Sequence, residues 1–231
     1  AIIEGKSLFE HVVDRLKRSK YNNIILATTD KENDKALIKI ADKIGISSFA
    51  GSEDDVLSRY LGVIEKFNLD VVVRVCSDNP FMDPEGIDQI VDHLLKNDLD
   101  YVANVHEKGW PEGFAGEAVK TKALLRVDKL SSDNLKYREH VTFYIRKNPE
   151  LFKVAYIDAP LDIQRPKLRL SIDTIDDLNV VNNIYKRLYK PGSIIPTREV
   201  IKLIDNEPEM LTHITDKTQF QYDLDHYLNR K

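Results

Sequence analysis

Acidic side chains recur directly after the segments of this sequence that have the pattern of β-strands. They are Asp30, Asp78, Asp173 and the run Ser52–Asp55. In open parallel sheets ligands bind beyond the carboxyl ends of the strands, so these residues would share one crevice. Carboxylates in one crevice repel each other unless a cation neutralises them, and Mg²⁺ bound to substrate phosphates needs only one or two protein carboxylates. The pattern therefore predicts a Mg²⁺–phosphate site at this edge.

Asp78 is the first candidate metal ligand. It follows the most apolar run of the sequence, Val71–Cys76, which is typical of a strand buried on both faces of a parallel sheet. Pro80 prevents that strand from continuing. The alternative is that Asp78-Asn79-Pro80 only forms a local turn or a helix cap.

Asp173 is the second candidate. It lies between an expected strand, Lys167–Ile172, and an expected helix, Asp176–Leu188. Thr174 and Asp177 have the spacing of a capping box, which would leave Asp173 free to face the crevice. The alternative is that Asp173 is itself the N-cap of this helix.

Further polar residues could serve a second substrate. Glu117 follows a glycine-rich loop, about His106–Gly116, and could reach a sugar hydroxyl or simply occupy an exposed strand position. The run Arg138-Glu139-His140 lies on an expected helix, Tyr137–Arg146, and offers a cation, an anion and a titratable group. Alternatively this run is a solvated helix face.

The elements that must position these residues alternate between strand and helix patterns. A capping box at Ser7 and Glu10 begins a first helix. Strands are expected over 23–30, 46–50, 71–76 and 100–105, and helices over 33–44, 56–67 and 86–95. This alternation predicts right-handed crossovers and a largely parallel sheet. We expect one domain over residues 1–205 and a polar C-terminal tail over 206–231.

Composition narrows the class of protein. The chain has 231 residues, 42% hydrophobic and 31% charged, with a net charge of −4, so a basic nucleic-acid or membrane-surface binder is not expected. The single cysteine, Cys76, excludes an internal disulfide. No transmembrane span, signal peptide, zinc ligand set, dinucleotide loop or Walker loop is found, and we expect a cytoplasmic protein.

Six segments together resemble a known family. They are Gly5–Leu16, Ala27–Asp30, Gly51–Tyr60, Val73–Pro84, Arg138–Thr142 and Ser171–Thr174. In this order and spacing they are similar to cytidylyltransferases of the spore-coat polysaccharide type, which are related to acylneuraminate and deoxy-octulosonate cytidylyltransferases. The resemblance spans roughly Gly5 to Tyr189, and the joint match is specific although each segment alone is weak.

The resemblance implies a three-layer α/β/α nucleotidyltransferase fold of the α/β class with a mostly parallel sheet. It implies transfer of CMP from CTP to a sugar or sugar acid, with release of pyrophosphate, in surface polysaccharide biosynthesis. It also implies a homodimer formed through about His106–Asn148. By position, Asp78 and Asp173 match the catalytic carboxylates that hold Mg²⁺. The residues that match positions flanking the nucleotide are Asp30, Ser52 and Arg59. The residues that fall on the side of the acceptor sugar are Glu117, Arg138, Glu139 and His140.

The sequence departs from the family pattern in three places. The family begins with a strand and a glycine- and arginine-containing loop that wraps the triphosphate, and this sequence starts after them. We therefore expect a gap in the centre of the sheet and a longer gene product. Ala115 stands where many relatives have an Asp, which leaves the acceptor open, and Ser7 replaces a Pro at the first helix start.

Two other functions stay open on the sequence. A glycosyltransferase with a nucleotide-sugar donor would share such a sheet, but it usually carries an Asp-x-Asp motif that Ser77–Pro80 lacks. A non-catalytic binding or oligomerisation module without the triphosphate loop is the third hypothesis.

Overall fold

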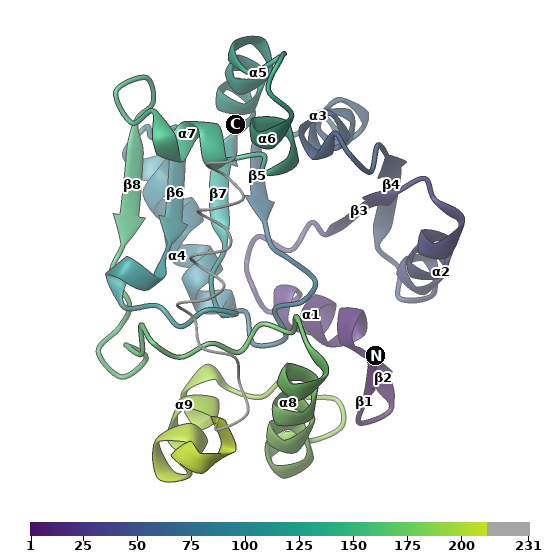
Figure 1. Cartoon of the computed structure of the whole chain (residues 1–231), viewed down its shortest axis with the longest axis vertical. Helices are drawn as coiled ribbons and strands as arrows, with labels where there is room; N and C mark the ends of the chain where they lie inside the picture. Colours follow the sequence, from purple (N-terminus) through teal and green to yellow (C-terminus); the bar gives the residue numbers. More distant parts are fainter. Residues whose placement is uncertain (212–231) are drawn as a thin grey trace.

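The computed structural model describes residues 1–211 (Figure 1). The first part of the chain forms a short hairpin and then alternates strands with helices. Its elements are β1 (Ile2–Ile3), β2 (Lys6–Ser7), α1 (Leu8–Leu16), β3 (Ile25–Thr29), α2 (Lys35–Lys43), β4 (Ser47–Gly51), α3 (Val56–Phe67), β5 (Val71–Arg74) and α4 (Pro84–Lys96).

The second part adds the remaining strands and a helical C-terminal region. Its elements are β6 (Tyr101–Asn104), β7 (Glu117–Lys120), α5 (Thr121–Leu130), α6 (Leu135–Glu139), α7 (Phe143–Lys147), β8 (Val154–Ile157), α8 (Ile175–Leu188) and α9 (Thr197–Asn206). Short 3₁₀ turns lie at Glu32–Asp34 (η1), His106–Lys108 (η2) and Pro208–Leu211 (η3).

The strands of the layer that carries the candidate residues form two separate sheets. β3 and β4 pair in parallel, with Ile25 opposite Ser47. The other sheet has the order β5-β7-β6-β8. Its strands β5, β6 and β8 share one direction, and β7 runs opposite to them because it pairs antiparallel with both β5 and β6.

A cavity of about 730 Å³ separates β3 from β5. Apolar side chains of α1, α3 and α4 line it, for example Val13, Val63 and Val91, together with residues of β3 and β5. Among the described residues, no strand pairs with the edges of β3 and β5 that border this cavity. The expected gap in the centre of the sheet is therefore present, and it leaves backbone donors and acceptors without strand partners.

Helices cover both faces of the four-stranded sheet. Tyr101 and Ala103 pack in a cluster with α3, α5 and α7, whereas Val102 packs with α4 on the opposite face. Successive residues of β6 thus serve two separate cores, as strand geometry requires. The three-layer α/β/α arrangement predicted from the resemblance is confirmed.

Both predicted capping boxes are confirmed. The Ser7 side chain accepts a hydrogen bond from Glu10 N at the start of α1, and Thr174 accepts from Asp177 N at the start of α8. These local patterns formed as expected because a capping box needs contacts over only three residues.

Two predictions about secondary structure are wrong. The expected helix Tyr137–Arg146 is broken into α6 and α7 around Val141, whose φ of 42° lies in the left-handed region that interrupts a right-handed helix. The expected strand Lys167–Ile172 is not a strand. Only a single parallel bridge, Arg169 with Glu112, forms there, because its neighbour is a loop rather than another strand.

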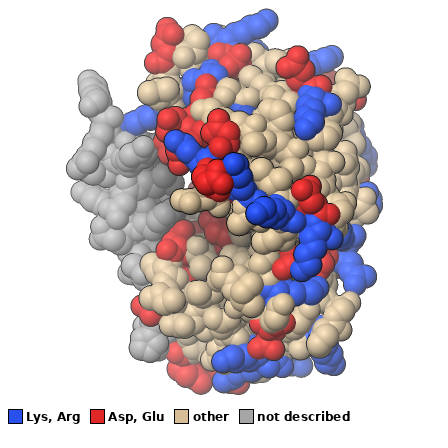
Figure 2. Space-filling view, turned by 90° about the vertical axis from the view of Figure 1, so that its right-hand side faces the viewer, with Lys and Arg blue, Asp and Glu red and all other residues tan. Residues whose placement is uncertain are grey.

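The expected tail, 206–231, begins at the end of α9, and its part from 212 onward lies outside the described residues. Within residues 1–211, no helix has both the length and the apolar character needed to cross a membrane. On the face of the molecule shown in Figure 2, basic and acidic side chains are interspersed rather than separated into patches of one sign.

Candidate active site

Three loops meet at the carboxyl end of β5. Ile172 N donates to Asp78 O at 3.0 Å, and Leu170 N donates to Glu112 O at 3.0 Å. Gly113 allows this approach because its φ is 92°, and a Cβ there would come within 2.8 Å of the Leu170 carbonyl carbon. The segment 168–173 therefore lies between the loop that carries Asp78 and the loop that carries Glu112.

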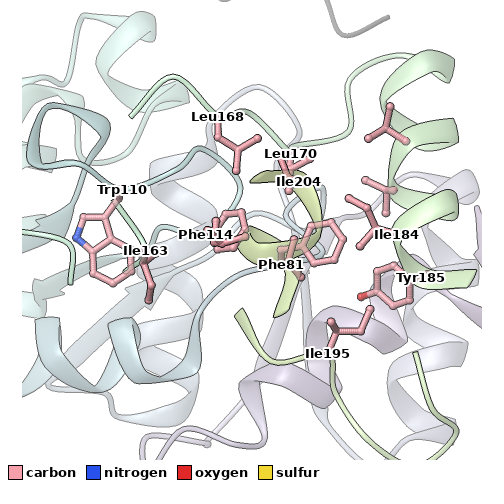
Figure 3. Close-up of a cluster of buried hydrophobic side chains, with 14 of the residues drawn as sticks. Phe81, Trp110, Phe114, Ile163, Leu168, Leu170, Ile184, Tyr185, Ile195 and Ile204 are labelled. Carbon is pink, nitrogen blue, oxygen red and sulfur yellow. The ribbon is translucent and has the colours of Figure 1, made fainter. Parts of the chain in front are cut away.

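A cluster of buried hydrophobic side chains anchors these loops (Figure 3). Phe81 packs on Phe114 and Tyr185 with ring centroids 6.0 and 5.4 Å apart, and Tyr185 OH donates to Pro80 O. Leu168 and Leu170 belong to the same cluster. Since the apolar residues of 168–171 take the core positions, the alternate residues Arg169 and Ser171 face the polar side chain of Glu112 instead.

Asp78 has the environment of a ligand-binding carboxylate. It lines the cavity between β3 and β5, and its Oδ1 atom is buried without a hydrogen-bond partner among the described residues. Burial raises the pKa of Asp78 above its ordinary value, and the nearby Glu112 charge adds to this rise. A buried polar atom without a partner is costly, so this oxygen is suited to bind a ligand.

Asp173 lies at the same place in the fold but is held differently. Its Oδ2 atom binds the Arg169 guanidinium, and its side chain is 40% exposed. The guanidinium, itself only 5% exposed, also binds Asp177 Oδ1 at 2.8 Å and contacts Glu112 Oε1 at 3.4 Å. The backbone bond from Ile172 N to Asp78 O thus places Asp173 next to a residue bound to the Asp78 loop, and the charges of Arg169 and Glu112 act on Asp78.

Glu112 and Arg169 were not predicted as site residues. The signal for Glu112 was an acidic residue between Pro111 and Gly113, in a loop that already looked irregular. Nothing in the sequence indicates that Arg169 contacts it, because their pairing depends on the approach of two loops 57 positions apart (169 − 112).

Of the three residues predicted near the nucleotide, Arg59 lines the same cavity as Asp78, whereas Asp30 and Ser52 are not part of its lining. Arg59 lines the cavity, its Nη1 donates to Ser52 O at 2.8 Å, and its Nε is buried without a hydrogen-bond partner among the described residues. Asp30 N donates to Gly51 O, which ties the end of β3 to the end of β4. Asp30 and Ser52 are exposed at this edge. Arg59 and Asp78 therefore offer opposite charges to one space.

Glu117 does not have the exposed position that was considered for it. Its carboxylate accepts hydrogen bonds from Arg74 Nη1 at 3.0 Å, Tyr101 OH at 2.6 Å and Thr142 Oγ1 at 2.9 Å. Burial alone would raise the pKa of Glu117, but the Arg74 charge and these bonds outweigh it and lower the pKa. Its bonds to three protein groups indicate that Glu117 orients its neighbours, and a contact with the acceptor stays a prediction.

The run Arg138-Glu139-His140 is not a uniformly solvated helix face. Arg138 binds Asp55 at 2.7 Å and Asp128 at 2.8 Å, and so joins α6 to the start of α3 and to α5. Glu139 is exposed, while His140 is half-buried and its burial lowers its pKa. The role of the run toward an acceptor stays a prediction.

The residues present fit a magnesium ion bound together with phosphates. Among the described residues, no group of three or more His, Cys, Asp or Glu side chains is arranged to hold a metal by itself. Asp78 and Asp173 supply oxygen donors, which suit Mg²⁺, and Mg²⁺ commonly takes its other ligands from water and substrate phosphates. The unpartnered Asp78 Oδ1 atom is the observation that supports this fit.

The fold and the site define a nucleotidyltransferase-like α/β protein. A family profile described as cytidylyltransferase matches residues 1–201. The chain therefore belongs to the cytidylyltransferase family.

Similar proteins cover most of the chain. The uncharacterized protein MJ1063 of Methanocaldococcus jannaschii is 38% identical over 208 residues, which are 89% of this chain and 82% of that protein. The spore coat polysaccharide biosynthesis protein SpsF of Bacillus subtilis is 32% identical over 210 residues, 89% of this chain and 86% of SpsF. A cytidylyltransferase structure from Leptospira borgpetersenii has a TM-score of 0.84 at 27% identity and covers 93% of this chain and 89% of its own.

A more distant similarity links the chain to enzymes named for one sugar acid. The 3-deoxy-manno-octulosonate cytidylyltransferase of Idiomarina loihiensis is 35% identical over 97 residues, 41% of this chain and 38% of that enzyme. A CMP:2-keto-3-deoxy-manno-octonic acid synthetase solved with CTP has a TM-score of 0.58 at 13% identity, covering 81% of this chain and 90% of its own. At 13% identity, the similarity to this synthetase concerns the fold alone.

Proposed function

We propose that this protein transfers CMP from CTP to a sugar or sugar acid, with release of pyrophosphate, in the synthesis of a surface polysaccharide. The single observation that carries the proposal is the unpartnered, buried Oδ1 of Asp78 beside Asp173, on a cavity shared with Arg59. The name of the similar spore coat polysaccharide biosynthesis protein SpsF supports the polysaccharide role, and the similar enzymes named for 3-deoxy-manno-octulosonate support a sugar-acid acceptor.

In the proposed reaction an acceptor oxygen attacks the α-phosphorus of CTP in line with the departing pyrophosphate. The new bond joins the acceptor oxygen to the α-phosphorus, the bond from the α-phosphorus to the bridging oxygen breaks, and the acceptor proton passes to solvent. Asp78 and Asp173 would hold Mg²⁺, which neutralises phosphate charge and lowers the pKa of the acceptor hydroxyl when bound. Arg59 offers a positive charge to the phosphates from the far side of the cavity.

The contribution of the chain is therefore positioning and charge neutralisation. The loops that carry Asp78 and Asp173 are tied by the Ile172–Asp78 backbone bond and anchored by the cluster around Phe81. We place the acceptor near His140 and Glu117, because Glu117 binds Arg74 at the cavity wall and Thr142 beside His140.

The test is pyrophosphate release from CTP, measured with a panel of sugars and sugar acids that includes 3-deoxy-manno-octulosonate. We expect release that requires Mg²⁺ and one of these acceptors. We expect Asp78→Asn to lower the rate by about 10²- to 10³-fold, the size found when one group that stabilises transition-state charge is removed. Unchanged turnover in the folded variant, or release of free nucleotide from a nucleotide sugar instead of pyrophosphate from CTP, would contradict the proposal.

We also propose that the protein forms a homodimer through the segment His106–Asn148. Large apolar side chains are exposed there, with Leu125 at 46%, Leu130 at 47% and Leu135 at 73%. Light scattering after gel filtration should give twice the chain mass, and Leu135→Glu should shift the particle toward a monomer. A monomeric wild type would contradict this proposal.

A further inference from the structure

Arg169 is a buried guanidinium at the centre of the candidate metal site. Its Nη2 binds Asp173 Oδ2, its Nη1 binds Asp177 Oδ1 at 2.8 Å, and its Nε lies 3.4 Å from Glu112 Oε1. Glu112 lies in the loop before β7, Asp173 lies in the segment before α8, and Asp177 lies in α8 itself. One side chain thus connects three carboxylates around the segment whose Ile172 N–H donates to the Asp78 carbonyl.

We propose that Arg169 is a positioning residue that holds Asp173 by Oδ2, so that Oδ1 of the same carboxylate stays turned to a divalent cation beside Asp78. This inference rests on the proposed function. It assigns the orientation of the second metal carboxylate to a residue that itself contacts neither the cation nor the substrate.

The planar fork of arginine explains how one residue can do this. Arginine presents several N–H donors in a fixed, planar geometry. Partners that bind two of the guanidinium nitrogens therefore fix the plane of the group and the direction in which the third nitrogen donates. Here Asp177 and Glu112 fix the plane. Asp177 is itself held, because its Oδ2 accepts the N–H groups of Asp173 at 3.0 Å and Thr174 at 2.8 Å.

The position of Asp173 argues against a purely structural ion pair. Asp177 alone, 1% exposed and 2.8 Å away, already gives the guanidinium a buried counter-charge. Asp173 is 40% exposed, and among the described residues its Oδ1 accepts no hydrogen bond that we observe. An arginine that holds one oxygen of a carboxylate and leaves the other open matches the way in which hydrogen-bonding neighbours orient metal ligands.

The inference is tested with Mn²⁺ as the probe. Free and bound Mn²⁺ are distinguished by electron paramagnetic resonance during titration of the full chain in the presence of CTP. We expect Arg169→Lys, which keeps the charge but loses the fork, to weaken Mn²⁺ binding by about tenfold or more. The matched control is Arg165→Lys, which alters the surface pair between Arg165 and Asp205 and should leave Mn²⁺ affinity unchanged.

A second variant covers the case in which Arg169→Lys does not fold. Glu112→Gln keeps the shape of the side chain but removes the negative charge beside Nε, and it should weaken Mn²⁺ binding less than Arg169→Lys. If Mn²⁺ affinity stays within about twofold of wild type in every folded variant of this pair, Arg169 serves stability alone and the inference is overturned.

The same titration separates this inference from the proposed function. Wild-type protein that binds no Mn²⁺ with CTP overturns both. Wild-type binding that Arg169→Lys weakens, without any pyrophosphate release, overturns the reaction and supports the positioning role. Pyrophosphate release together with unchanged affinity in both variants overturns only the positioning role.

Discussion

Two networks of arginine and carboxylate lie near the end of β5, and they differ in charge balance. In the described part of the chain, Arg169 is surrounded by Glu112, Asp173 and Asp177, with Asp78 close by. In the other network the carboxylate of Glu117 binds Arg74, with the neutral hydroxyls of Tyr101 and Thr142 completing its hydrogen bonds.

The difference separates a structural network from a site. Glu117 and Arg74 neutralise each other across paired strands, where they occupy directly opposite positions of β7 and β5. Around Arg169 three carboxylates share one guanidinium, and the nearby Asp78, on which the Arg74 charge also acts, has an Oδ1 atom without a hydrogen-bond partner in residues 1–211. A further cation would stabilise this excess of carboxylates, so the imbalance supports the proposed Mg²⁺ site.

The largest expected effect on stability comes from the balanced network. Glu117→Ala would leave the Arg74 charge buried without its counter-ion, and we expect a loss of about 3 kcal/mol in the free energy of unfolding. Glu112→Ala, the matched change in the acidic network, should cost less than about 1 kcal/mol, because Arg169 keeps two other carboxylates. Urea denaturation measures both, and equal losses would remove the contrast between the networks.

The next effect concerns the nucleotide. Arg59→Met keeps the apolar stem of the side chain but removes its positive charge from the cavity. We expect CTP to bind about tenfold more weakly, which is a loss of about 1.4 kcal/mol in binding free energy. Arg198→Met is the control, because Arg198 forms exposed ion pairs with Asp162 and Glu85. Calorimetry with Mg²⁺ present measures both affinities. Equal CTP affinity in the two variants would show that Arg59 does not contact the phosphates.

The smallest expected effect is a gain in stability on loss of the Asp78 charge. Because burial raises the pKa of Asp78, the fold favours its protonated form. The stability from this group is present below the ordinary Asp pKa and is lost as the pH rises through the folded-state value.

Without metal, Asp78→Asn should therefore raise Tm at pH 7 by about 2 °C, and the gain should shrink as the pH is lowered toward the ordinary Asp range. Thermal unfolding followed by circular dichroism at several pH values measures this. A Tm that falls at pH 7 would mean that the Asp78 carboxylate is already satisfied in the fold.

The sequence predicted those features that depend on local spacing or on strand ends. The capping boxes at Ser7 and Thr174 formed as expected, and Asp78 lies where a strand end in an open sheet places it. The three-layer fold, the family and the interrupted sheet were also predicted, because the matching segments can be recognised in order along the chain.

The sequence could not predict which polar groups meet through tertiary contacts. Arg138 binds Asp55, 83 positions away, and Glu117 binds Arg74, 43 positions away. Such pairs follow from the crossing of loops and strands, not from any local pattern. The helix break at Val141 was missed for the same reason. Val141 has a left-handed conformation, and the hydroxyl of the next residue, Thr142, donates to the distant carboxylate of Glu117.

The central claim is that Asp78 and Asp173 hold one Mg²⁺ with the phosphates of CTP. Calorimetric titration of CTP into the wild-type chain, with and without Mg²⁺, tests it most directly when repeated on Asp78→Asn. We expect wild-type binding to depend on Mg²⁺ and the variant to bind CTP weakly whether or not Mg²⁺ is present. CTP binding of equal strength in all four titrations would contradict the claim.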